Sequence, residues 1–122
     1  MTPTETYREA SRHLQAQAEA EYAADDLRQA SEKGWGSAAQ IVKAMCVERG
    51  WRHDHHGLLF EAVRALRVET GDEELYVLFS VAHNQHINFY ENWLDAWEVR
   101  RDLDDVRRFV DKVETLLTVD AT

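Results

Sequence analysis

Residues 99–117, VRRDLDDVRRFVDKVETLL, repeat an apolar side chain alternately every four and every three positions. This spacing puts one apolar side chain on the same side of each helical turn. The apolar positions are Val99, Leu103, Val106, Val110, Val113 and Leu117. The positions between them carry mixed charges, as a face in contact with water does. The segment predicts an amphipathic helix that buries one side against other helices.

Helix start signals divide the rest of the chain. Three pairs have the spacing of a capping box, in which two residues satisfy free backbone N–H groups at a helix start. These pairs are Thr2 with Glu5, Asp26 with Gln29, and Asp95 with Glu98. Asp54 or His55 is expected to begin a third helix, and the acidic turn 72–74 a fourth that runs to about Asn92.

Helix stop signals agree with these starts. Gly50 and Gly71 each follow a helical segment, where glycine commonly ends a helix. No strand pattern, linker or repeat interrupts the series. The sequence therefore predicts an all-α protein, an antiparallel up-down bundle of about five helices, with residues 1–122 in a single domain.

Composition limits the classes of function. The 122 residues include 23 acidic and 14 basic side chains, a net charge of −9, whereas a large nucleic-acid footprint needs a concentrated basic surface. No apolar run approaches the ~20 residues of a membrane-spanning helix. The lone Cys46 lies among apolar residues and is expected to be buried in a reducing compartment. We expect a soluble, cytoplasmic protein without membrane contact.

Polar side chains interrupt the predicted core of the fourth helix. Residues 82–94 read AHNQHINFYENWL. The expected buried face comprises Leu75, Phe79, Ala82, Phe89 and Trp93, with His86 in the gap of the series. Burying a polar group costs free energy, so this stretch indicates either a site or hydrogen bonds that hold the helices in register. His83, His86 and Tyr90 share one side of the helix.

Gly34 and Gly36 flank Trp35 within the second helix. Each glycine costs a helix ~1 kcal/mol relative to alanine, so the pair indicates that another element comes close. Tight helix packing around Trp35 is one interpretation, and a ligand site is the other.

The histidines offer two metal hypotheses. His53, Asp54, His55 and His56 have the ligand types that zinc and similar metals use, although a solvated loop has the same composition. His83 and His86 would need carboxylates from other helices, as in di-metal bundles that use Glu-x-x-His. That motif is absent here, and so are phosphate loops and hydrolase signatures. We therefore expect no metal and no cofactor.

Two segments together resemble a known family. Residues 30–44, ASEKGWGSAAQIVKA, and residues 86–94, HINFYENWL, are similar in order and separation to segments of the archaeal PaREP-type family of HEPN-like helical proteins. The similarity spans roughly residues 20–117. It implies an antiparallel helical core, often dimeric. HEPN domains act as RNA-cleaving toxins or as partners of minimal nucleotidyltransferases.

The HEPN nuclease motif is an arginine followed after four to six residues by a histidine, near the start of a late core helix. The nearest arginine before His83 and His86 is Arg67, which is too far. Arg8 with His13, and Arg49 with His55 or His56, fit the bare pattern but lie in the first helix and the following loop. The sequence therefore favours a protein without nuclease activity.

These observations predict a non-catalytic HEPN-like binding or partner module, a homodimer that engages a nucleotide or a nucleotidyltransferase partner. The residues expected to line its polar groove are Glu32, Trp35, His83, His86, Asn88 and Tyr90. One alternative is a HEPN-type toxin in which His86 acts as general acid or base with an arginine from elsewhere. The other is a metal-binding bundle built on the loop histidines.

Overall fold

Five α-helices account for nearly all of the computed structural model, which describes residues 1–120. They are α1 (Pro3–Ala23), α2 (Leu27–Arg49), α3 (His56–Thr70), α4 (Glu74–Glu91) and α5 (Ala96–Asp120). No strand occurs within these 120 residues. The predicted all-α fold of five helices is confirmed.

The helices begin at the capping residues that the sequence indicates. The Thr2 and Asp26 side chains accept hydrogen bonds from the backbone N–H groups of Glu5 and Gln29, at 3.2 and 3.0 Å. Of the two candidates for α3, His55 is the cap, and its Nδ1 accepts from the Leu58 N–H. These bonds satisfy backbone groups that a helix end leaves free.

Three helices end in the left-handed conformation. Gly50 and Gly71 have φ values of +70° and +74°, which favour glycine because other side chains are strained there. Asn92 ends α4 with φ +53°, and asparagine tolerates this region better than most residues. The predicted boundaries of α2, α3 and α4 are therefore confirmed to within a residue or two.

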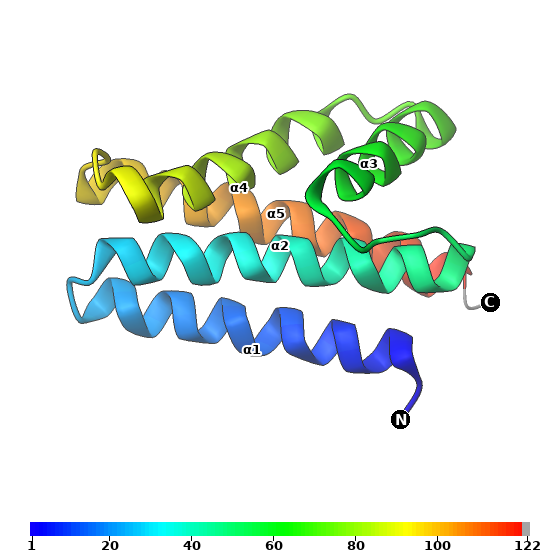
Figure 1. Ribbon diagram of the computed structural model, residues 1–122, viewed down its shortest axis with the longest axis horizontal. Helices are drawn as coiled ribbons and strands as arrows, with labels where there is room; N and C mark the ends of the chain where they lie inside the picture. Colours follow the sequence, from blue (N-terminus) through cyan, green and yellow to red (C-terminus); the bar gives the residue numbers. More distant parts are fainter. Residues whose placement is uncertain (121–122) are drawn as a thin grey trace.

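The four long helices alternate in direction along the molecule (Figure 1). The short α3 departs from this order, because the chain folds back along α2 before α3 begins (Figure 1). Helix α3 then lies at an angle beside α4, with ring contacts from His86 to Tyr76. Helix α2 contacts all four other helices. It therefore forms the centre of the bundle, with α1 on one side and α3, α4 and α5 on the others.

The core follows the predicted seam of α5 closely. Val99, Leu103, Val106, Val110, Val113 and Leu117 are all buried. They pack against α2, where apolar side chains from Ala30 to Cys46 are buried around much of the helix. A second, smaller cluster forms at one end, where Ala18 and Ala30 meet Val99 and Leu103.

The predicted buried face of α4 is correct only in its first half. Leu75, Phe79 and Ala82 are buried, but Trp93 is 62% exposed and Phe89 is half-buried. Gln85 and Asn88 take their place and have no exposed surface. The physical reason lies at the end of α4, where Asn88 Oδ1 accepts hydrogen bonds from the backbone N–H groups of Trp93 and Leu94. This bonding draws the Asn88 side of the helix inward.

No helix in the described part of the chain combines the length and apolar character needed to cross a lipid bilayer.

The two glycines of α2 accommodate leucine side chains rather than a ring or a ligand. A Cβ atom at Gly34 would lie 2.7 Å from Leu103 Cδ2, and one at Gly36 would lie 3.1 Å from Leu14 Cδ1. Leu103 is buried, whereas Leu14 is half-buried and can move outward. Of the two interpretations, tight helix packing is the one that the structure supports.

We expect Gly34→Ala to lower the free energy of unfolding by about 1 kcal/mol, because overpacking of ~1–3 kcal/mol outweighs a helix-propensity gain of ~1 kcal/mol. Gly36→Ala serves as the matched control and should be neutral or stabilising, since Leu14 can give way. Urea unfolding of the three proteins measures the difference. Equal stability of the two variants would contradict the packing argument.

Candidate functional site

Trp35 lies at the junction of α2, α3 and α4, and three histidine rings surround it. Its ring centroid is 5.0 Å from that of His56, 5.4 Å from that of His83 and 5.6 Å from that of His86. The histidine rings are 5.4–6.3 Å from one another. We call His56, His83 and His86, together with Glu32, the histidine cluster. Trp35 is almost fully buried and holds the three helices in this arrangement.

His86 is paired with the carboxylate of Glu32. His86 Nδ1 lies 3.1 Å from each carboxylate oxygen of Glu32, and the two side chains are 22% and 29% exposed. An ionised carboxylate can only accept hydrogen bonds, so Nδ1 carries the hydrogen and donates it. The other ring nitrogen, Nε2, is then a free acceptor when the ring is neutral. A histidine oriented by a carboxylate in this way can bind a donor group or exchange a proton.

The other two histidines are held in their neutral form. Partial burial lowers the pKa of His56 and of His83 below the ordinary value of 6.5, and the neighbouring His86 adds to both effects. Lys43 lowers the pKa of His56 further, against a smaller opposing effect of Glu32. At neutral pH these two rings therefore present nitrogen lone pairs rather than positive charges.

Of the residues predicted to share a groove, Asn88 does not join the others. It is fully buried, donates from Nδ2 to Ser31 Oγ at 3.0 Å, and caps the end of α4 with its Oδ1. Tyr90 is 67% exposed, and its ring stands edge-on to His86 with the centroids 5.4 Å apart. Asn88 is thus a structural residue, whereas Tyr90 lies at the rim of the cluster.

The loop histidines diverge. His53 packs against Tyr7, His55 caps α3, and only His56 turns toward Trp35. Within residues 1–120, no group of three or more His, Cys, Asp or Glu side chains has an arrangement that could hold a metal ion. The geometry therefore gives no support to a metal centre on the loop.

The sequence interpretation missed His56. It separated the loop histidines from the pair on α4, because His56 and His83 are 27 positions apart and no local spacing connects them. One signal was available, since His56 stands four residues before Phe60 and therefore shares a helix face with it. Phe60 packs against His83, with ring centroids 5.2 Å apart.

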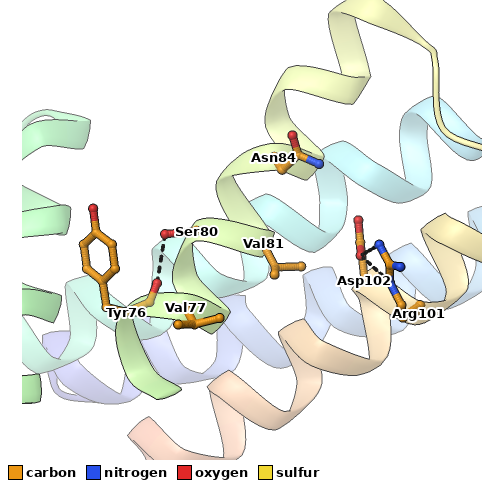
Figure 2. A pocket seen from close by; sticks show the side chains of 7 residues that line it. All are labelled: Tyr76, Val77, Ser80, Val81, Asn84, Arg101 and Asp102. Carbon is orange, nitrogen blue, oxygen red and sulfur yellow. Dashed lines mark hydrogen bonds and ion pairs between the residues drawn. The ribbon is translucent and has the colours of Figure 1, made fainter. Parts of the chain in front are cut away.

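A hollow of about 420 Å³ lies between α4 and α5, away from the histidine cluster (Figure 2). Its charged side is formed by Arg101 and the buried Asp102, whose carboxylate accepts hydrogen bonds from Arg101 and from Gln85 Nε2. Burial raises the pKa of Asp102 above its ordinary value. Among the described residues, Gln85 Oε1 has no partner. The apolar repeat of α5 did not predict that Asp102 is buried. Asp102 lies in a run of charged residues, and such a run is typical of a helix face in contact with water.

The sequence matches the model of the archaeal PaREP1/PaREP8 family over residues 6–110, which confirms the resemblance that residues 30–44 and 86–94 indicate. The structure is similar to the crystal structure of a protein from Sulfolobus solfataricus, with a TM-score of 0.74 and 27% sequence identity. That similarity covers 96% of this chain and 98% of the other. The search of curated proteins found no match.

The lowered histidine pKa values predict how stability responds to pH. Below about pH 6.5 the unfolded chain takes up protons at His56 and His83 more readily than the folded chain does. The two neutral rings therefore contribute their full stabilisation to the folded state above about pH 6.5. This contribution is lost as the pH falls through the lower pKa values that His56 and His83 have in the folded state. The free energy of unfolding should therefore decrease from pH 7.5 to pH 5.5.

Replacing one of these histidines by glutamine, which does not titrate, should flatten this dependence. Urea unfolding of His83→Gln at several pH values measures the slope, and the exposed His13 on α1 supplies the control variant His13→Gln. If both variants keep the slope of the original protein, the histidine cluster does not cause the pH dependence.

Proposed function

The chain belongs to the archaeal PaREP1/PaREP8 family. We propose that it is a non-catalytic binding module whose histidine cluster holds a nucleotide. The observation that carries the proposal is the convergence of His56, His83, His86 and Glu32 from three helices around Trp35. Polar groups that converge beside aromatic rings are typical of small-molecule sites.

The chemistry of the cluster favours a planar ligand that donates hydrogen bonds. The carboxylate of Glu32 and the free Nε2 of His86 accept such bonds, and two exposed rings, His56 and Tyr90, lie next to His86. A nucleobase has a flat face for stacking and N–H groups along its edge, so it satisfies both requirements. A phosphate would gain little here, because His56 and His83 are uncharged at neutral pH and Glu32 is an acid.

The contacts of His86 support a role without catalysis. Its hydrogen-bond and ring partners within residues 1–120 are Glu32, Trp35, His56, His83 and Tyr90. None of these is an arginine. Cleavage of RNA develops negative charge on the phosphate, which a nearby cation normally stabilises.

One observation favours the competing proposal of an RNA-cleaving toxin. The pair formed by His86 and Glu32 has the arrangement of a general base oriented by a carboxylate. Such an enzyme would need an arginine brought from a second copy of the chain.

The proposal extends to the organisation of the protein. We regard residues 1–122 as one HEPN-like domain that works in the cytoplasm as a homodimer, with a nucleotidyltransferase as a further partner. Contact of α2 with every other helix supports the single domain. Burial of the Cys46 thiol raises its pKa to about 11, and an unreactive lone thiol suits a reducing compartment. The exposed Val77, Trp93 and Trp97 supply apolar surface for a dimer.

If the cluster binds nucleotides, adding them should shift the imidazole NMR signals of His56, His83 and His86 and leave that of His13 on α1 unchanged. His86→Ala should weaken binding at least about tenfold, since it removes one charge-assisted pair and leaves Glu32 without its donor. Titration calorimetry measures the affinity, and His13→Ala is the control. Absence of any shift in the cluster, with all four ribonucleotides tested, would overturn the proposal.

The same protein should show no RNA cleavage above background. A cleavage assay on the original chain and on His86→Ala separates the two proposals. Activity that is lost in His86→Ala would establish the toxin instead of the binding module.

The homodimer should appear in light scattering as a mass of twice 14.2 kDa. Trp97→Ser removes a ring that is 62% exposed and stacks on the guanidinium of Arg101. The fold should therefore be retained while the dimer weakens. Lys33→Ser, a surface change on α2, is the control. A monomeric mass for the original chain at micromolar concentration would refute the dimer.

A further inference from the structure

A row of ring contacts leads from the histidine cluster along the seam of α3 and α4. Phe60 packs against His83 at 5.2 Å and against Tyr76 at 6.1 Å, measured between ring centroids. The guanidinium carbon of Arg64 lies 5.5 Å from the Tyr76 ring centroid and 6.0 Å from that of Phe60. The row therefore begins at the cluster and ends at a positive charge.

Arg64 supplies the positive charge at the end of this row. It is exposed, and among the described residues no carboxylate lies within ion-pair distance of it. The neighbouring Arg67 is engaged by Glu73 at 2.7 Å. Stacking on two rings fixes the position of the Arg64 guanidinium and leaves its hydrogen-bond donors unused.

These residues border a hollow of suitable size. Arg64, Arg67, Val68 and Tyr76 line a surface hollow of about 410 Å³. The planar guanidinium of Arg64 presents paired donors that match a phosphate or a carboxylate. Arg67 lines the same hollow, but its ion pair with Glu73 offsets its charge. The hollow thus has the size and the charge of an anion subsite.

The distance between the histidine cluster and Arg64 suits one elongated ligand that contacts both. His56 and Arg64 are eight residues apart on α3, which corresponds to about 12 Å along the helix. The acidic Glu32 pairs with His86, at the cluster end of the row. An elongated ligand is therefore oriented, with its planar hydrogen-bond donor at the histidines and its anionic group at Arg64.

We propose that Arg64, in the hollow that it shares with Arg67, forms an anion subsite that extends the histidine cluster, so that the ligand is a nucleoside polyphosphate. This inference rests on the proposed function, because the cluster must first hold the base. The ribose and the chain of phosphates separate the base from the terminal phosphate, which allows the two ends to occupy both sites.

The experiment compares the four ribonucleosides with their four triphosphates by titration calorimetry at low salt. A triphosphate should bind at least about tenfold more tightly than its nucleoside, the gain typical of hydrogen bonds to a charged group. Arg64→Ala should remove this gain and leave nucleoside affinity unchanged. Arg64→Lys, which keeps the charge but loses the paired donors, should retain part of it.

Arg8→Ala is the matched control, because it removes one positive charge from α1, a helix that does not contact α3. Thermal unfolding of each variant confirms that the fold is retained. If nucleosides bind and triphosphates bind no more tightly, the anion subsite is wrong while the proposed function stands. The inference is also overturned if the triphosphate gain persists in Arg64→Ala, or if His86→Ala leaves triphosphate affinity intact. Absence of binding by either class defeats both proposals.

Discussion

The burial of α2 is the constraint on which the remaining structure depends. This helix contacts every other helix and has apolar or small side chains around much of its circumference. Gly34 permits the close approach of Leu103 from α5, and Trp35 fills the space where α3 and α4 converge. Because Trp35 is shared by three helices, the packing that completes the core also assembles the histidine cluster.

Buried hydrogen bonds fix the position of each helix along its neighbours. Ser11 and Ser37 exchange hydrogen bonds between α1 and α2, at 2.7 and 2.9 Å. Asn88 joins α4 to Ser31 of α2, and Gln85 joins α4 to Asp102 of α5. Each such bond adds only about 1 kcal/mol, but breaking it leaves a buried polar group without a partner, which costs more. The interior polar residues therefore specify one alignment of helices whose apolar faces alone would tolerate several.

The polar residues of α4 fall into two groups, one buried in the core and one near the surface. Gln85 and Asn88 face inward and serve the fold. His83 and His86 lie beside His56 of α3, and Tyr90 is exposed next to His86. About two turns of helix thus carry both structural and candidate functional residues. The sequence interpretation grouped Asn88 with the histidines because neighbours in a polar run cannot be assigned to faces until the partners of the helix are known.

The sequence by itself determined the helices and their ends. Caps such as Thr2, Asp26, Gly50 and Gly71 act within a few residues, and the seam of α5 follows a local period, so both are legible in the chain. It also indicated Glu32, Trp35 and the two histidines of α4. Only the tertiary structure decided that His56 lies with these residues and that Asn88 does not. It also decided that Arg64 lies at the end of the row of rings between α3 and α4. Those outcomes depend on contacts between residues far apart in the chain, and local spacing carries no information about such contacts.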